Sequence, residues 1–98
     1  MLIEKLGKSN WSSEGYLIKV NNNWFFDLIV GNGKIKEIGI LKGRKSPSYN
    51  QAFVVTPQNL SLYEISQKYK GKINIAKSLF KIGKELVEKL EKYDKIEF

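Results

Sequence analysis

Residues 24–42 read WFFDLIVGNGKIKEIGILK, two apolar runs on either side of an Asn-Gly pair. Asparagine and glycine tolerate the left-handed backbone of a two-residue turn, so this pattern is the strongest short-range signal for a β-hairpin. A turn at residues 32–33 would place Asp27 opposite Ile38. Because side chains alternate along strands, Asp27 and Lys42 would then share one face of the hairpin.

Both faces of this hairpin are largely apolar, which indicates a sheet that is covered by helices on both sides. Periodicity, turn residues and capping signals predict the rest of the chain. In chain order, the expected elements are a helix over 2–12, for which a strand is the alternative, a strand over 16–20, hairpin strands over 24–30 and 35–42, a polar loop over 43–51, a strand over 52–56, a helix that a capping box opens at Ser61–Glu64 and Gly71 ends, a strand over 73–76, and a helix that Ser78 caps and that runs to Tyr93.

The last four of these elements alternate strand and helix, which implies a right-handed parallel crossover. The sequence therefore predicts one α/β domain spanning residues 1–98, with a central mixed β-sheet of about five strands, an N-terminal antiparallel hairpin and helices on both faces.

The composition restricts the chemistry. The 98 residues include no cysteine and no histidine, which excludes disulfides, thiolate or imidazole metal sites and most catalytic triads. Seventeen Lys and Arg against ten Asp and Glu give a net charge of +7, which favours a polyanionic partner such as nucleic acid. The alternative is that the lysines only keep the protein in solution. The first residues do not read as a signal peptide and no apolar run has membrane-spanning length, so we expect a cytoplasmic protein without a membrane partner.

The stretch Asp27-Leu28-Ile29-Val30-Gly31-Asn32-Gly33-Lys34-Ile35, followed by Ile40-Leu41-Lys42, resembles the core of the restriction-endonuclease-like PD-(D/E)xK nuclease superfamily, and archaeal Holliday-junction resolvases in particular. In that superfamily an Asp closes one strand, an acid-x-Lys tripeptide lies on the next, and a Glu often sits on the preceding helix. The resemblance implies a restriction-endonuclease-like fold. It also implies that Asp27 and Glu4 would hold Mg²⁺ while Lys42 would stabilise charge on a phosphate.

The motif departs from the superfamily at Ile40, which stands where the tripeptide has its acid. A hydrocarbon cannot ligate Mg²⁺, so we expect catalysis to be impaired. Glu37 is the nearest replacement, but it lies on the opposite face unless a bulge at Gly39 realigns it. A second departure is that only residues 43–51 stand where the resolvases have a helix.

Each of these residues also has an ordinary structural interpretation. Asp27 would then be a hydrogen-bonded strand acid, Lys42 a solvated strand end, and Glu4 a surface glutamate.

Three functions therefore remain open. The first is a DNA-binding protein with a nuclease-like fold and impaired catalysis, acting on duplex or branched DNA. The second is an active Mg²⁺-dependent endonuclease that uses Asp27, Lys42 and either Glu4 or Glu37. The third is a small protein-interaction subunit that forms a homodimer through a sheet edge or its C-terminal helix. Cations and one stacking ring are predicted to grip the nucleic acid, namely Lys34, Lys36, Lys42, Arg44, Lys45 and Tyr49.

Overall fold

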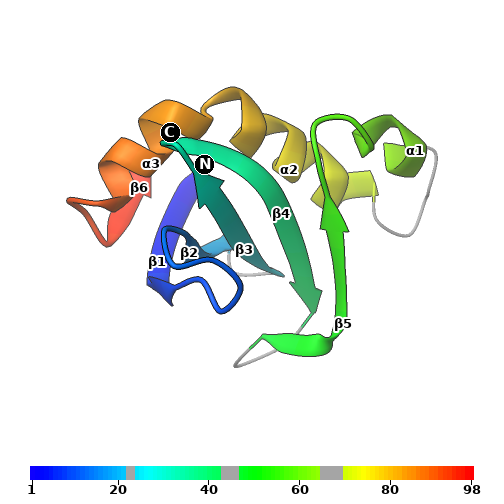
Figure 1. Cartoon of the computed structure of the whole chain (residues 1–98), viewed down its shortest axis with the longest axis horizontal. Coiled ribbons are helices and arrows are strands. Elements are labelled where there is room, and N and C mark those ends of the chain that lie inside the picture. The colour runs from blue at the N-terminus through cyan, green and yellow to red at the C-terminus, as the bar shows by residue number, and fades with distance from the viewer. Residues whose placement is uncertain (22–23, 43–46, 65–69) are drawn as a thin grey trace.

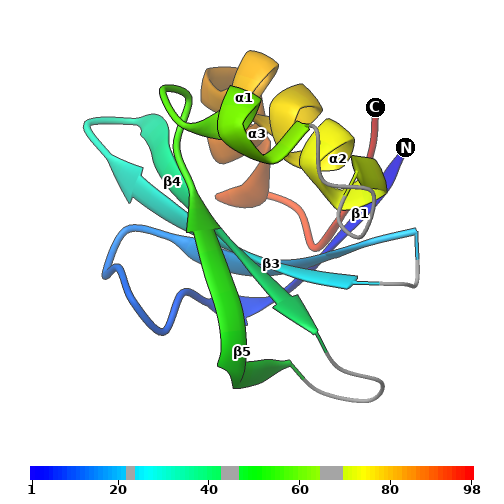
Figure 2. The ribbon, with the colours of Figure 1, turned by 90° about the vertical axis from the view of Figure 1, so that its right-hand side faces the viewer.

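Across the residues that the structure describes, six strands form one antiparallel sheet, and three helices lie on one of its faces (Figure 1 and Figure 2). The computed structural model describes residues 1–21, 24–42, 47–64 and 70–98. The strands are β1 (Leu2–Lys8), β2 (Tyr16–Val20), β3 (Trp24–Gly31), β4 (Lys34–Lys42), β5 (Ser48–Val55) and β6 (Lys95–Glu97). The helices are α1 (Leu60–Glu64), α2 (Lys70–Lys81) and α3 (Gly83–Leu90). The strand order in the sheet is β5-β4-β3-β2-β1-β6.

The predicted mixed sheet of about five strands with helices on both faces is wrong. The first five strands follow one another in the sheet as an antiparallel meander, and β6 pairs with β1, also antiparallel. Antiparallel neighbours need only short turns, whereas a parallel pair needs a long crossover connection. The described residues contain no parallel pair, so they lack the crossover expected of a restriction-endonuclease-like fold.

The predicted strand at 73–76 is wrong because these residues belong to α2. Ile73, Ala76 and Leu79 are all fully buried, and their spacing of three residues places them on one side of a helix that faces the sheet. This helical stripe outweighs the strand preference of the isoleucines. Gly71 accordingly lies at the start of α2 instead of ending a helix.

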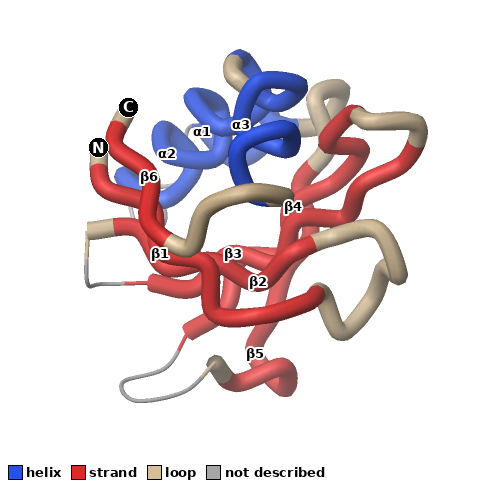
Figure 3. The backbone as a smooth tube through the Cα atoms, turned by 90° about the vertical axis from the view of Figure 1, so that its left-hand side faces the viewer, coloured by secondary structure: helices blue, strands red, loops and turns tan. Residues whose placement is uncertain are grey.

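The helix preferred at 2–12 is also wrong, because its first part is the strand β1, as the alternative for these residues has it. Ile3 is fully buried and pairs with Val20 on one side and with Ile96 on the other. The two ends of the chain therefore lie side by side (Figure 3). The backbone N–H of Phe98 donates a 2.9 Å hydrogen bond to the carbonyl oxygen of Met1, which fixes this pairing.

Helix α1 is capped upstream of the predicted position. The backbone N–H of Thr56 donates to Oδ1 of Asn59 at 2.7 Å, and the N–H of Asn59 donates back to Oγ1 of Thr56 at 3.2 Å. This reciprocal pair, with Pro57 directly after Thr56, starts the helical turn earlier than the capping box expected at 61–64. Residues 65–69 of that predicted helix lie outside the described residues.

The central hairpin is confirmed. Asn32 and Gly33 both have positive φ angles, 55° and 74°, as a tight turn with a right-handed strand twist requires. On the face toward the helices, β3 and β4 bury Phe26, Leu28, Ile38 and Ile40, which form the main core with the apolar sides of α2 and α3. We call the other side of the sheet the open face.

Candidate nucleic-acid interface

Asp27 lies at the centre of the open face and is 0 % exposed, the one buried charged residue of the described chain. Its Oδ1 accepts a hydrogen bond from the hydroxyl group of Ser9. Its Oδ2 accepts one from the backbone N–H of Asn10 at 3.0 Å and one from the hydroxyl group of Tyr49 at 2.8 Å. The carboxylate therefore ties the β1–β2 loop and the start of β5 to the sheet, which matches the interpretation of Asp27 as a hydrogen-bonded strand acid.

The structure does not bring Asp27 and Lys42 together. The turn is placed as predicted, but Lys36 is an extra residue in β4, and beyond this bulge the register shifts by one. Asp27 consequently pairs with Gly39 instead of Ile38. A shift of one residue exchanges the two faces of a strand, so Lys42 falls on the face opposite Asp27. The predicted pairing of the aspartate with the lysine is wrong.

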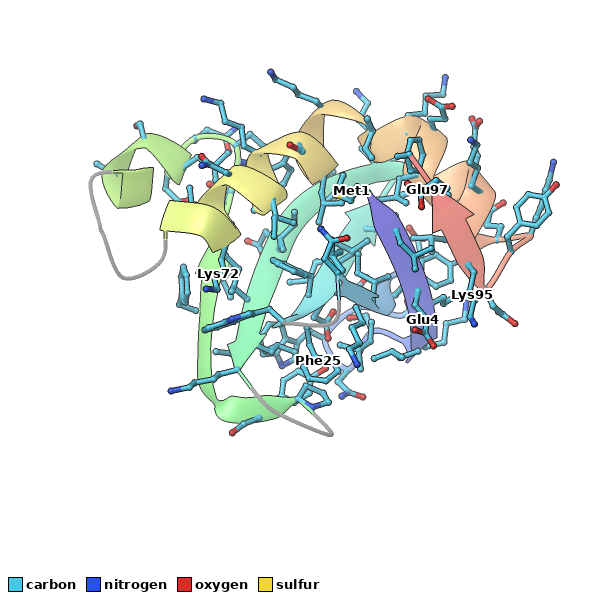
Figure 4. All side chains as sticks on the ribbon, turned by 180° about the vertical axis from the view of Figure 1, so that it is seen from behind. Met1, Glu4, Phe25, Lys72, Lys95 and Glu97 are labelled. Carbon is cyan, nitrogen blue, oxygen red and sulfur yellow. The ribbon has the colours of Figure 1, made fainter. Side chains whose placement is uncertain are left out.

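The other carboxylates expected at an Mg²⁺ site lie apart from Asp27. Glu4 is on β1, opposite Lys19, which places it two strands or about 10 Å from β3. Figure 4 shows it next to Lys95, toward the β6 edge. Glu37 shares the open face because of the bulge at Lys36, diagonal to Asp27, while Ile40 is buried against the helices.

These residues do not fit a magnesium ion. Both oxygens of Asp27 already accept hydrogen bonds from the protein, and Glu4 is too distant to share a ligand shell with it. Throughout the described ranges, no three carboxylates cluster closely enough to bind a metal ion.

Two contacts hold the side chain of Tyr49 on the open face. Its ring meets the ring of Trp11 edge to face, with the centroids 5.0 Å apart, and its hydroxyl group is bonded to Asp27. Burial, together with the hydrogen bond and the negative charge of Asp27, raises the pKa of Tyr49 to about 12. The ring predicted to stack on a base is thus occupied by Trp11. Arg44 and Lys45, predicted beside it, lie outside the described residues.

The positive charge of the chain is concentrated in α2 and at Lys84, near the start of α3. Residues 70–84 contain five lysines and no acid, and so carry +5 of the net charge of +7. Residues 85–97, by contrast, hold five acids and three lysines. The C-terminal half therefore presents a basic surface on α2 and a mixed or acidic one after it.

A hollow of about 470 Å³ lies where this basic segment meets the hairpin and α1. Ile35, directly after the turn between β3 and β4, lies against Gly83 at the start of α3. The hollow is lined by four lysines and five apolar or glycine residues, namely Lys34, Lys77, Lys81, Lys84, Ile35, Pro57, Leu60, Phe80 and Gly83. No carboxylate is among these lining residues. We call this site the lysine hollow.

Three of the four lysines at the hollow are available to a ligand. Lys34, Lys81 and Lys84 are exposed, and within the described part of the chain none of them forms an ion pair or a hydrogen bond. Lys89, one turn beyond Lys84, differs because it pairs with Glu85 at 3.6 Å. Like charges gathered around one hollow repel one another, and a bound anion would relieve that repulsion.

Two of the predicted nucleic-acid contacts, Lys34 and Lys36, are exposed on β4, and Lys34 lines the hollow. The exposed Lys42 lies at the other end of β4. Sequence reasoning missed Lys77, Lys81 and Lys84. The absence of any acid between residues 70 and 84 was a signal that could have found them, but the placement of Lys34 beside them depends on the fold.

Comparison with known proteins adds no relative: no family model, no curated protein and no solved structure matches this chain. The resemblance to the PD-(D/E)xK superfamily therefore depends on the sequence motif alone. The helices in the described residues are all too short or too polar to cross a lipid bilayer.

Proposed function

We propose that this protein binds nucleic acid through the sugar-phosphate backbone, at the surface formed by α2, the start of α3 and the β3–β4 turn. The observation that carries the proposal is the lysine hollow, in which four lysines from three elements surround one site that no carboxylate lines. Lysine is a compact point charge that suits phosphates and reads bases poorly, so binding through this surface depends little on sequence.

The charge distribution supports this choice of surface over the open face. The described part of the open face carries Glu4, Asp27 and Glu37 beside Lys19 and Lys95, and Asp27 is already satisfied by its hydrogen bonds. A phosphate backbone would be attracted more strongly at α2 than at this mixed surface, because a cationic surface releases counterions when it binds phosphates.

The test is a titration of a labelled oligonucleotide, followed by fluorescence anisotropy at several salt concentrations. If the three lysines Lys34, Lys81 and Lys84 each neutralise one phosphate, log K falls with log salt at a slope of about −2. The variant Lys81→Gln/Lys84→Gln removes two contacts, so it should flatten the slope by roughly 1.4 and weaken binding about twentyfold at 0.1 M salt.

The matched control is Lys92→Gln/Lys95→Gln, which removes the same charge from exposed lysines outside the hollow. Equal losses in the two variants would contradict a defined surface and leave only net charge. A stable dimer in a mass measurement, together with no salt-dependent binding, would instead favour the protein-interaction subunit.

A further inference from the structure

The lysine hollow has two chemically different parts. Its lining includes the exposed lysines Lys34, Lys81 and Lys84, which we call the rim, and the buried or half-buried apolar residues Ile35, Leu60 and Phe80, which we call the interior. Lysines alone are sufficient to hold a phosphate backbone. The apolar interior is therefore suited to a second, apolar part of the ligand. Its volume of about 470 Å³ falls in the range of small-ligand pockets, about 300–1,000 Å³.

A nucleobase is the part of a nucleic acid that suits such an interior. In a duplex the flat faces of the bases are stacked on one another, whereas a single strand can turn a base outward. Proteins that bind single strands combine a cationic groove with apolar or aromatic side chains on which bases stack. The hollow has both features, and Phe80 supplies the aromatic ring.

We propose that the hollow accepts one unstacked base of a single-stranded segment, while the lysines on its rim hold the neighbouring phosphates. This inference rests on the proposed function and names its substrate class, single-stranded nucleic acid. Four elements hold the site in place. Ile35 and Leu60 are 7 % and 8 % exposed, so the interior is anchored in the core of the fold.

The chemistry of the lining also predicts how little the site selects among bases. The side chains that line the hollow are lysine or apolar, and none of them is an amide, a hydroxyl or a carboxylate that could read a base edge. Stacking tolerates every base, since each has a flat aromatic face. The site should therefore discriminate single strands from duplexes much more strongly than it discriminates among sequences.

The first test compares three labelled DNA probes of equal length: a single strand, the same strand with abasic positions, and a duplex. The abasic strand keeps the phosphates and lacks the bases. We expect the intact strand to bind about tenfold more tightly than the abasic strand, the gain typical of stacking one base. The duplex should also bind more weakly than the intact strand.

The second test uses Phe80→Leu, which keeps an apolar side chain in the hollow and removes the aromatic ring. Its matched control is Phe53→Leu, another partly buried phenylalanine that packs on the same core outside the hollow. Phe80→Leu should remove most of the preference for the intact strand over the abasic strand, and Phe53→Leu should leave it unchanged. Thermal unfolding of both variants checks that they remain folded.

The outcomes separate the two proposals. Equal binding of all three probes with a steep salt dependence would overturn the base-accepting hollow and leave backbone binding in place. A preference that survives in Phe80→Leu would also overturn it. Failure to bind any probe at low salt would overturn the proposed function itself.

Discussion

The hydroxyl group of Tyr49 donates a 2.8 Å hydrogen bond to Oδ2 of Asp27, although β4 lies between their strands in the sheet. The bond bridges the open face and holds the start of β5 over it. Trp11 completes the arrangement, because its ring packs on Gly39 of the intervening strand and against the ring of Tyr49. The acid that resembled a nuclease ligand thus organises the open face.

Asp27→Ala should destabilise the protein strongly. The change leaves the hydroxyl groups of Ser9 and Tyr49 and the N–H of Asn10 without their acceptor, so we expect the free energy of unfolding to fall by about 3 kcal/mol. Urea unfolding measures it, and Glu37→Ala on the same face is the control, with an expected change within about 0.5 kcal/mol. Equal stability of the two variants would contradict the anchoring role of Asp27.

The stability of the protein should decline in strongly alkaline solution through Tyr49. Its pKa is about 12 in the folded protein against an ordinary value of 10.0, so folding favours the protonated phenol. The stabilisation is complete below pH 10.0, and it is lost as the pH rises toward 12. Tyr49→Phe should lack this decline, and its tyrosinate absorbance should lack a step near 12. If the absorbance step that Tyr49→Phe loses lies near pH 10.0 instead, Tyr49 is not buried beside Asp27.

Gly39→Ala should displace Trp11. A Cβ atom at this position would lie 2.1 Å from Cζ3 of the indole ring, so the ring must lift away from the sheet. We expect a loss of about 1–3 kcal/mol and a red shift of the tryptophan fluorescence. In a Trp11→Ala background the same substitution should cost much less, and an equal cost in both backgrounds would refute the contact.

The hairpin could be predicted from the sequence, but its register could not. Asn32 and Gly33 specify the turn by local backbone chemistry alone. The bulge at Lys36 left no signal because both faces are apolar: Phe25 and Leu41 are buried on the open face, as Phe26 and Ile40 are against the helices. Either register would bury similar side chains, so the alternation of apolar residues could not choose between them.

The helix at 70–81 and the lysine hollow needed the tertiary structure. Isoleucines at 73 and 75 favour a strand locally, and only packing against the sheet makes Ile73 and Ala76 one side of a helix. The excess of lysine was visible in the composition, but the convergence of Lys34 with Lys81 depends on a turn and a helix that lie far apart in the chain. The overall basic charge therefore predicted a class of partner without predicting its surface.

The conservative change Asp27→Asn separates the proposed function from the nuclease interpretation. We expect it to leave oligonucleotide affinity within about twofold of the wild type wherever the variant is folded, because Asp27 lies on the face away from the helices that carry the lysines. Nicking of DNA in the presence of Mg²⁺ that disappears in Asp27→Asn would contradict this assignment and restore the endonuclease.

The most direct test of the central claim is a heteronuclear NMR titration of the full chain with a short single-stranded oligonucleotide. The predicted result is that the backbone resonances of Lys34, Ile35, Phe80, Lys81, Gly83 and Lys84 shift together in a saturable way, while those of Asp27 and Trp11 stay in place. Shifts centred on the open face around Trp11, with the lysine hollow unperturbed, would contradict it.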